Sequence, residues 1–182
     1  IENIDKGTMR TTPIIRDLKT FSREDAETII ALDLHVLIDS TIKLLDKKLL
    51  KNISIYHTYG TIPPVYCLPG RLGQVFLNIM HNALQAMDET GDLTIATQYQ
   101  NEHVHIVFSD TGCGIPTSDL AKIFDPFFTS KEVGKGTGLG LGISYAIVRQ
   151  HGGVINVQSK MGEGTMFEVV LPVDFRAVPQ SI

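Results

Sequence analysis

The chain has 182 residues, of which 43% are hydrophobic, so it can bury the core of one globular domain and still carry an appendage. Its net charge is −4, with 16 Lys and Arg against 20 Asp and Glu, which excludes the basic surface of a nucleic-acid-binding protein. The two cysteines, Cys67 and Cys113, have no metal-ligand spacing and predict reduced thiols in a cytoplasmic protein.

Residues 1–24 predict a separate amphipathic helix. Apolar and small side chains recur there at heptad-like spacing, and Pro13 should kink or restart the helix. One short helix is only marginally stable alone, so it needs a partner. That partner is either its own domain or a second helix in a bundle dimer, and the sequence does not decide between them. The chain has no signal-peptide pattern, and it begins at Ile1 without a methionine. We therefore expect a fragment, whose parent protein is either anchored in a membrane or not.

Helical and extended patterns alternate along residues 25–175, which we expect to form the main domain, with 176–182 as a C-terminal tail. The predicted elements, in chain order, are a helix over 34–50, a strand over 53–59, a proline-rich loop, a helix over 71–87, a hairpin of strands over 93–99 and 103–109, a short helix over 119–124, a long mobile loop over 124–138, a helix over 140–150, and strands over 154–159 and 165–171 joined by a turn at 162–164. Together they predict an α+β fold, a two-layer α/β sandwich. Its mixed, mainly antiparallel five-stranded sheet is covered on one face by three helices.

Three segments of this domain carry chemistry. Asp110 directly follows a predicted buried strand and begins the motif Asp-Thr-Gly-Cys-Gly-Ile-Pro. A carboxylate there, with Gly112 and Gly114 allowing close approach, can accept a hydrogen bond from the six-amino group of adenine, where guanine has a carbonyl. An aspartate that only caps a turn is the competing interpretation, and the motif alone leaves both open.

The second segment is the predicted helix over 71–87. Asn78 and Asn82 lie four residues apart and so share one face of it. An amide oxygen is a hard, neutral ligand that suits Mg²⁺ already carrying phosphate oxygens and water. Two buried amides bonded to backbone are the alternative.

The third segment has a glycine at every second position from Gly134 to Gly142. Such backbone offers N–H groups to an anion, and a helix N-terminus that favours phosphate follows. The spacing fits neither a Walker loop nor a dinucleotide-binding motif, so it predicts a third kind of phosphate loop. The aromatics at 124, 127 and 128 should clamp against the domain when the loop closes. Lys131 and Lys135 either follow the phosphates or are simply solvated.

These segments, in this order, resemble the ATP-binding domain of bacterial two-component sensor histidine kinases, in the wider family that includes gyrase, Hsp90 and MutL. Asn78 with Asn82 resembles the N box, and the G1, F and G2 boxes and the G3 turn correspond to 110–116, 124–128, 136–142 and 162–165. Residues 127–138 are most similar to kinases of the nitrogen-regulation or dicarboxylate-sensor type. The resemblance covers about residues 30–175 and implies the Bergerat ATP-binding fold.

The resemblance also implies roles for the matching positions. Asp110 would bind the adenine amine with Gly114 and Thr165, and Asn82 would hold Mg²⁺. Residues 1–24 would be the second helix of a dimerisation and histidine-phosphotransfer hairpin. The implied ATP-binding positions are Asn78, Asn82, Asp110, Gly112, Gly114, Ile115, Phe124, Lys131, Gly136, Thr137, Gly138, Leu139, Gly140, Leu141 and Thr165.

The phosphoacceptor histidine of these kinases lies on the first hairpin helix, usually before an acidic residue. None of the six histidines here has that setting. We therefore expect an ATP- and Mg²⁺-dependent protein histidine kinase domain with no catalytic nucleophile of its own, unable to phosphorylate itself. The expected partners are a phosphotransfer hairpin, from its own missing segment or another protomer, and a response regulator; a homodimer stays open.

Three alternatives remain, of which a serine or threonine protein kinase of the same fold is disfavoured by the hairpin-like helix predicted over residues 1–24. An ATPase of the gyrase, Hsp90 and MutL branch uses a glutamate four residues before the metal-binding asparagine as general base, and Asn78, which stands there, cannot take a proton from water. A non-catalytic nucleotide-binding or dimerisation module would also lack the acceptor histidine. Such a module has no need for the metal asparagine, the lid aromatics and the glycines together.

Overall fold

A five-stranded sheet is the centre of the computed structural model, which describes residues 28–45, 50–88, 90–129 and 136–177. Its strands have the order β2-β4-β5-β7-β6, with β2 paired to β4 in parallel and the other neighbours antiparallel. The predicted mixed, mainly antiparallel sheet is therefore confirmed. The strands are β2 (Ile53–Tyr59), β4 (Gly91–Gln100), β5 (His103–Asp110), β6 (Val154–Lys160) and β7 (Gly164–Pro172).

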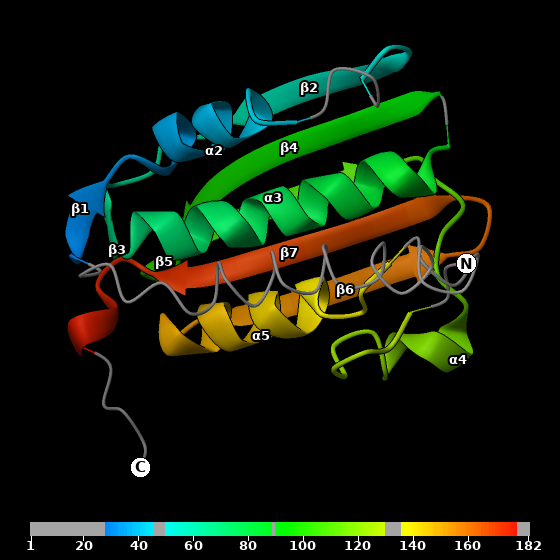
Figure 1. Ribbon diagram of the computed structural model, residues 1–182. Coiled ribbons are helices and arrows are strands. Elements are labelled where there is room, and N and C mark those ends of the chain that lie inside the picture. Colours follow the sequence, from blue (N-terminus) through cyan, green and yellow to red (C-terminus); the bar gives the residue numbers. More distant parts are fainter. Residues whose placement is uncertain (1–27, 46–49, 89, 130–135, 178–182) are drawn as a thin grey trace, which may run out of the picture.

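Three helices lie together on one face of the sheet, as the sequence predicts (Figure 1). They are α2 (Leu34–Ile42), α3 (Pro69–Ala86) and α5 (Gly140–Gln150). The apolar side of α3 packs on the middle of the sheet, where the rings of Phe76 and Phe108 have centroids 5.7 Å apart. Burying a side chain of this size contributes about 1.5–3 kcal/mol to stability, so this layer of contacts holds α3 in place.

A buried histidine sets the position of α5 against α3. His151 accepts a hydrogen bond at Nε2 from the N–H of Leu68, the residue that precedes α3, at 3.1 Å, and donates from Nδ1 to the carbonyl of Ile147 at 2.8 Å. Because each ring nitrogen has a partner of fixed polarity, the imidazole is neutral with its proton on Nδ1. The C-terminal end of α5 is thereby joined to the N-terminal end of α3.

The predicted helix over 34–50 is wrong in length. α2 ends at Ile42, and the amides of Leu44 and Leu45 bond to the carbonyls three residues earlier, at 3.0 and 3.1 Å. Such bonds tighten and end a helix. Leu45 is nevertheless buried, so a turn, rather than a further helical turn, brings this apolar residue inward.

Two short strands were not predicted: β3 (Val65–Cys67) lies within the predicted proline-rich loop, and β1 (Ile30–Leu32) lies just before the predicted helix over 34–50. They pair antiparallel as a separate two-stranded sheet. The predicted short helix at 119–124 is instead α4 (Thr117–Leu120), directly after Pro116, and a short 3₁₀ helix, η1 (Phe175–Ala177), lies near the C-terminus. Strands of three residues show too little periodicity to be read from sequence. The predicted N-terminal helix, at residues 1–24, lies outside the described residues.

The sheet face opposite the helices carries a polar group across three strands. Glu168 of β7 accepts hydrogen bonds from Asn156 of β6 and from His105 of β5, each at 2.9 Å. These bonds, the one from Asn156 first, hold the pKa of the Glu168 carboxyl below its ordinary value. A carboxyl whose pKa falls on folding stabilises the protein above its ordinary pKa.

We expect Glu168→Gln to lower the free energy of unfolding at neutral pH by about 0.5–1 kcal/mol. The difference from wild type should disappear as pH falls through the folded pKa of Glu168, because the wild-type carboxyl is then protonated too. Urea denaturation at a series of pH values measures this, with the exposed Glu102→Gln as the control. A difference that stays constant into acid would contradict the electrostatic explanation.

Candidate functional site

One row of residues across the sheet is apolar on β4 and polar on β5, β7 and β6. Asp110 of β5 lies opposite Thr165 of β7, and Thr165 lies opposite Ser159 of β6. Directly opposite residues on neighbouring strands point to the same face, here the helix-covered one. The continuation of the row on β4 is the buried Leu93, opposite Asp110. The sheet thus presents a carboxylate and two hydroxyls side by side.

Asp110 is almost fully buried, with 8% of its surface exposed. Its Oδ1 accepts hydrogen bonds from the backbone N–H of Gly112 at 2.9 Å and of Thr165 at 3.3 Å. Burial raises the pKa of this carboxyl, and the two backbone bonds only oppose that rise. Both bonds go to one oxygen, so among the described residues Oδ2 keeps its lone pairs for a donor from a ligand.

The loop after Asp110 is held from two sides. The N–H of Cys113 donates to the carbonyl of Ala86 at the end of α3, at 3.0 Å. A Cβ on Gly114, which has a φ of +75°, would lie 2.2 Å from the carbonyl oxygen of Lys160. Only glycine permits this approach, which brings the Asp110 loop against the end of β6. The N–H of Ile115, the next predicted site residue, donates to Ser159 Oγ at 2.8 Å.

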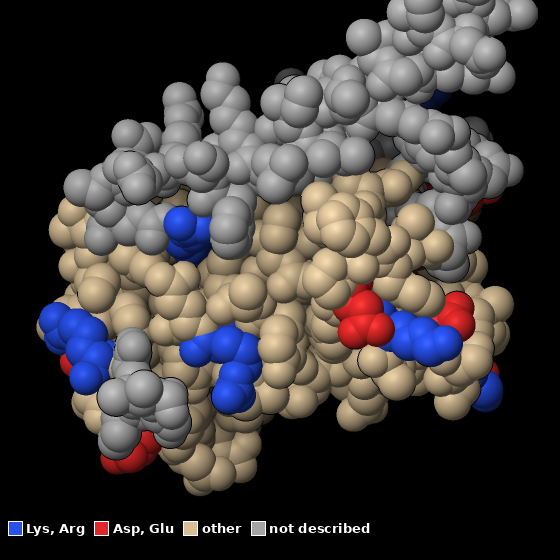
Figure 2. Space-filling view, turned by 60° about the horizontal axis from the view of Figure 1, so that its bottom comes forward, with Lys and Arg blue, Asp and Glu red and all other residues tan. Residues whose placement is uncertain are grey.

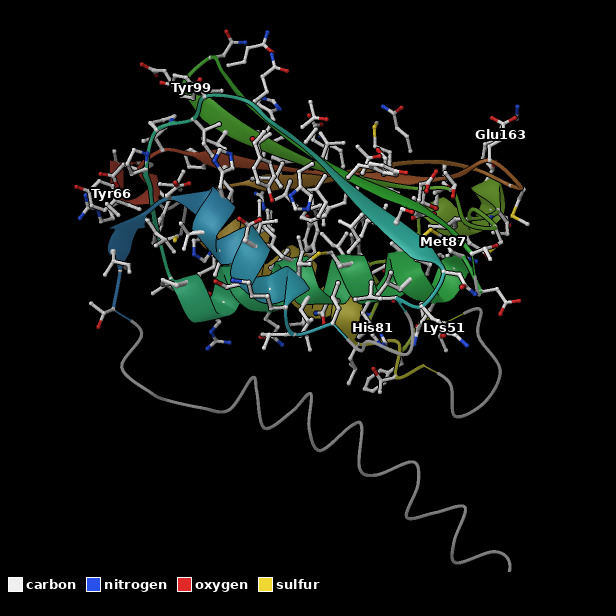
Figure 3. The ribbon with its side chains drawn as sticks, turned by 90° about the horizontal axis from the view of Figure 1, so that it is seen from above. Lys51, Tyr66, His81, Met87, Tyr99 and Glu163 are labelled. Carbon is white, nitrogen blue, oxygen red and sulfur yellow. The ribbon has the colours of Figure 1, made fainter. Side chains whose placement is uncertain are left out.

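The side-chain view places this loop at one end of the molecule. Met87, directly after α3, and Glu163, in the turn between β6 and β7, lie at the same end, opposite Tyr66 and Tyr99 (Figure 3). The contacts of Cys113 with Ala86 and of Gly114 with Lys160 connect the Asp110 loop to both of these landmarks. Asp110 and Thr165, which the resemblance assigned to one site, therefore lie together in the structure.

The two asparagines of α3 have different surroundings. The side-chain amide of Asn78 donates to the carbonyl of Gly140 at 3.0 Å and to Ser144 Oγ at 3.2 Å. Asn78 therefore ties the first turn of α5 to the middle of α3. Asn82, one helical turn further along, is half-buried, and its amide oxygen is the candidate metal ligand on this helix.

The predicted phosphate loop runs into the N-terminus of α5. No side chain caps this end of the helix, and the first N–H groups of any helix have no acceptor within it. Gly140 is the first helical residue, Leu139 precedes it, and the N–H of Leu139 bonds to the Thr137 hydroxyl at 3.3 Å. Leu141 packs on the core, while Gly136 is exposed. The arrangement offers backbone donors to an anion.

The aromatic loop divides into packed and exposed residues. Phe124 and Phe128 pack against the core, and the Phe124 ring lies 5.5 Å from that of Tyr145 on α5. Phe127 is 70% exposed in this structure, so its expected packing on loop closure remains a prediction. Its backbone N–H bonds to the carbonyl of Gly138 at 2.9 Å, which turns its side chain outward. Lys131 and Lys135 lie outside the described residues.

The surface around these elements has no broad field of one charge in its described part. On the side where α5 and α4 lie, Lys and Arg form small separate groups between uncharged areas (Figure 2). The backbone amides at the start of α5 are one set of donors that the described residues offer to a phosphate.

Sequence reasoning missed two hydroxyls of the site. Ser159 bonds to Ile115, Gly164 and Thr165, and Ser144 bonds to Asn78 and Gly140. The alternation of Ile155, Val157 and Ser159 already places this serine on the inward face of its strand. Its partners, however, follow only from the register with β7.

Comparisons with known proteins agree with this geometry. Residues 67–174 match the family model described as histidine kinase-, DNA gyrase B- and HSP90-like ATPases. The chain is 39% identical to the sensor kinase CckA of Brucella abortus and 35% identical to the sensor histidine kinase ZraS of Escherichia coli, over 94% of this chain in both cases. It spans only 20% and 37% of the lengths of these relatives.

Solved structures give the same result. The nucleotide-free catalytic domain of the histidine kinase ThkA superposes with a TM-score of 0.74 at 30% identity, covering 82% of this chain and 98% of that one. ThkA in complex with the response regulator protein TrrA superposes with a TM-score of 0.75 at 25% identity, covering 97% and 51%.

Proposed function

Because this chain belongs to the family of histidine kinase-, DNA gyrase B- and HSP90-like ATPases, we propose that it is the ATP-binding catalytic domain of a sensor histidine kinase. In this proposal it presents the γ-phosphate of ATP to a histidine on a phosphotransfer hairpin. The observation that carries the proposal is the buried Asp110 carboxylate, which holds one oxygen on backbone amides and keeps the other for a ligand donor. Adenine supplies that donor through its six-amino group.

The chain's own residues divide the work of binding. Asp110 and Thr165 take the base, and the amides at the start of α5 take the phosphates. Asn78 keeps α5 in place against α3 through its bonds to Gly140 and Ser144. The packed aromatics Phe124 and Phe128 hold the base of the loop that leads to the glycines.

Mg²⁺ fits the donors of this site as a companion of the nucleotide. The described residues contain no group of three or more His, Cys, Asp or Glu side chains that could hold a metal by themselves. Asn82 contributes one neutral amide oxygen, which suits an ion whose other ligands are phosphate oxygens and water. When bound, the ion neutralises charge on the transferring phosphate.

The contacts of Asn78 argue against the hydrolytic branch of the family. An ATPase needs a general base for water. Asn78 is an amide, and it is already committed to the carbonyl of Gly140 and to Ser144. Positioning ATP for a nucleophile brought by another helix requires no such base.

The partners that we propose follow from this role. They are a hairpin domain that carries the acceptor histidine, from the same parent protein or a second protomer, and a downstream response regulator. The structure of ThkA with TrrA supports the second of these by similarity. The parent protein would then be a cytoplasmic or membrane-anchored sensor, and within the described residues no helix is both long and apolar enough to cross a bilayer.

We expect the chain to bind ATP with a millimolar or lower Kd that requires Mg²⁺, and to phosphorylate a separate cognate hairpin on its histidine. Calorimetry with and without Mg²⁺ measures the first. Radiolabelled ATP measures the second through an acid-labile, alkali-stable phosphate on the hairpin. The chain incubated alone is the control and should stay unlabelled. ATP binding without transfer to any cognate hairpin would favour a non-catalytic nucleotide-binding module.

A further inference from the structure

We propose that Ser159 is a positioning residue that fixes the direction of the Thr165 hydroxyl and so makes the site select a purine with an amine, rather than a carbonyl, at its six-position. The inference rests on the proposed function, because it concerns how the same site reads the base. Ser159 does not need to touch the nucleotide for this role.

The hydrogen bonds around Ser159 leave one arrangement of protons. A serine hydroxyl has one proton and two lone pairs. Its Oγ lies 2.8 Å from the carbonyl oxygen of Gly164, which can only accept, so the proton of Ser159 goes there. The N–H of Ile115 can only donate, and it occupies one lone pair at 2.8 Å. The remaining lone pair faces Thr165 Oγ1 at 2.9 Å, so Thr165 must be the donor of that bond.

This arrangement makes Thr165 an acceptor on its other side. Its only hydroxyl proton is used on Ser159, so Oγ1 can offer only lone pairs to a ligand. Asp110 Oδ2, on the neighbouring strand, likewise offers only lone pairs, because an ionised carboxylate has no proton to donate. Two acceptors then lie side by side in one row of the sheet. An amine supplies donors to such a row, whereas a carbonyl oxygen meets only lone pairs.

Burial makes this polarity matter. Thr165 and Asp110 expose 6% and 8% of their surfaces, so a wrongly matched base cannot be compensated by bulk water. One unmatched buried hydrogen-bonding group changes affinity roughly 5- to 100-fold. If Ser159 did not hold the Thr165 proton, the hydroxyl could rotate and donate to a six-carbonyl, and part of the selectivity would be lost.

The test compares ATP with inosine triphosphate, which has a carbonyl in place of the six-amino group. Dissociation constants of both Mg²⁺ complexes are measured by calorimetry for the whole chain. Wild type should prefer ATP strongly. Ser159→Ala should lower the ratio of the two constants roughly tenfold, because the freed Thr165 hydroxyl can turn to the carbonyl. Ser159→Thr keeps a hydroxyl and should keep the ratio, and Ser54→Ala, on the exposed edge strand β2, is the matched control.

A double variant distinguishes loss of the Thr165 hydroxyl orientation from a general loosening of the loop. Thr165→Val removes the hydroxyl that Ser159 directs, so adding Ser159→Ala to it should leave the ratio unchanged. If Ser159→Ala does not fold, Ser159→Cys keeps the size of the side chain and, as a weak donor and acceptor, should lower the ratio less strongly.

Equal weakening of ATP and inosine triphosphate by Ser159→Ala would overturn the inference, since it would make Ser159 only a structural support of the loop. The same outcome for Ser159→Cys would overturn it as well. A wild-type chain that binds neither nucleotide would instead overturn the proposed function. The two failures are therefore distinguishable in one set of titrations.

Discussion

Replacing Asp110 with asparagine should weaken ATP binding roughly a hundredfold, about 3 kcal/mol. The amide oxygen of asparagine can still accept from Gly112 and Thr165, as Oδ1 does now. The other position becomes an NH₂ group, which faces the six-amino group of adenine donor to donor. The loss combines a missing charge-assisted hydrogen bond with a buried mismatch. Calorimetry with Mg²⁺ and ATP measures it.

The same substitution should not destabilise the fold. A loss of ATP binding without a loss of stability then shows that the variant has not simply misfolded. Burial raises the pKa of Asp110, so the folded protein binds this proton more tightly than the unfolded chain. Wild type therefore loses stability as pH rises from the ordinary aspartate value through the raised one. Asparagine does not ionise. At neutral pH, Asp110→Asn should be at least as stable as wild type, and the advantage should vanish in acid below the ordinary pKa.

The control for this prediction is Asp92→Asn, which makes the same change in charge at an exposed position of β4. It should bind ATP like wild type. If Asp110→Asn binds ATP normally, the carboxylate does not contact the nucleotide, and Asp110 is only a turn residue. A melting temperature that falls together with affinity would mean that Asp110 supports the loop instead of reading a base.

Replacing Gly164 with alanine should lower the free energy of unfolding by about 3–5 kcal/mol. Gly164 has a φ of +110°, and a Cβ there would lie 1.9 Å from the carbonyl oxygen of Asp110. Both partners are backbone in a paired region of the sheet, so neither can move away without breaking the β5–β7 ladder. We expect ATP binding to fall as well, because the displaced segment includes Asp110.

Gly162→Ala is the matched control in the same turn. Gly162 also has a positive φ, +78°, but nothing lies within 4 Å of a Cβ there. It should therefore cost only the left-handed backbone strain, about 1 kcal/mol. Urea denaturation of the two variants measures the difference. Equal losses would show that strain, rather than the contact with Asp110, explains the need for glycine at 164.

Much of the fold could be predicted from local patterns, and the errors have physical causes. The strand over 53–59 and the helix over 140–150 have the predicted ends, because a glycine or a polar turn adjoins each of them. The predicted helix over 34–50 was too long. The chain leaves the helix after Ile42, and a turn buries Leu45 where a continued helix would also have buried it. The spacing of apolar residues predicts which residues are buried, but it does not predict whether a helix or a turn buries them.

The candidate site was predicted less completely. Asp110, Thr165 and the glycines were recognised from short motifs, and the structure brings Asp110 and Thr165 into direct contact. The expected role of Asn78 beside phosphate remains a prediction, while its tie to Gly140 was not foreseen. A four-residue spacing shows that two side chains share a helix face. It does not show which neighbouring helix that face meets.

The sequence by itself determined the class of fold and the family, and it supplied the residue types of the proposed nucleotide site, because periodicity, glycines and the order of the motifs are local properties of the chain. Only the tertiary structure decided that Ser159, Thr165 and Asp110 form one row and therefore which hydroxyl donates to which. Strand register depends on pairing between distant segments, such as Asp110 and Thr165, which lie 55 residues apart, and a shift of one residue would turn every side chain of a strand to the other face. The direction of a single proton in this site is thus a consequence of long-range pairing.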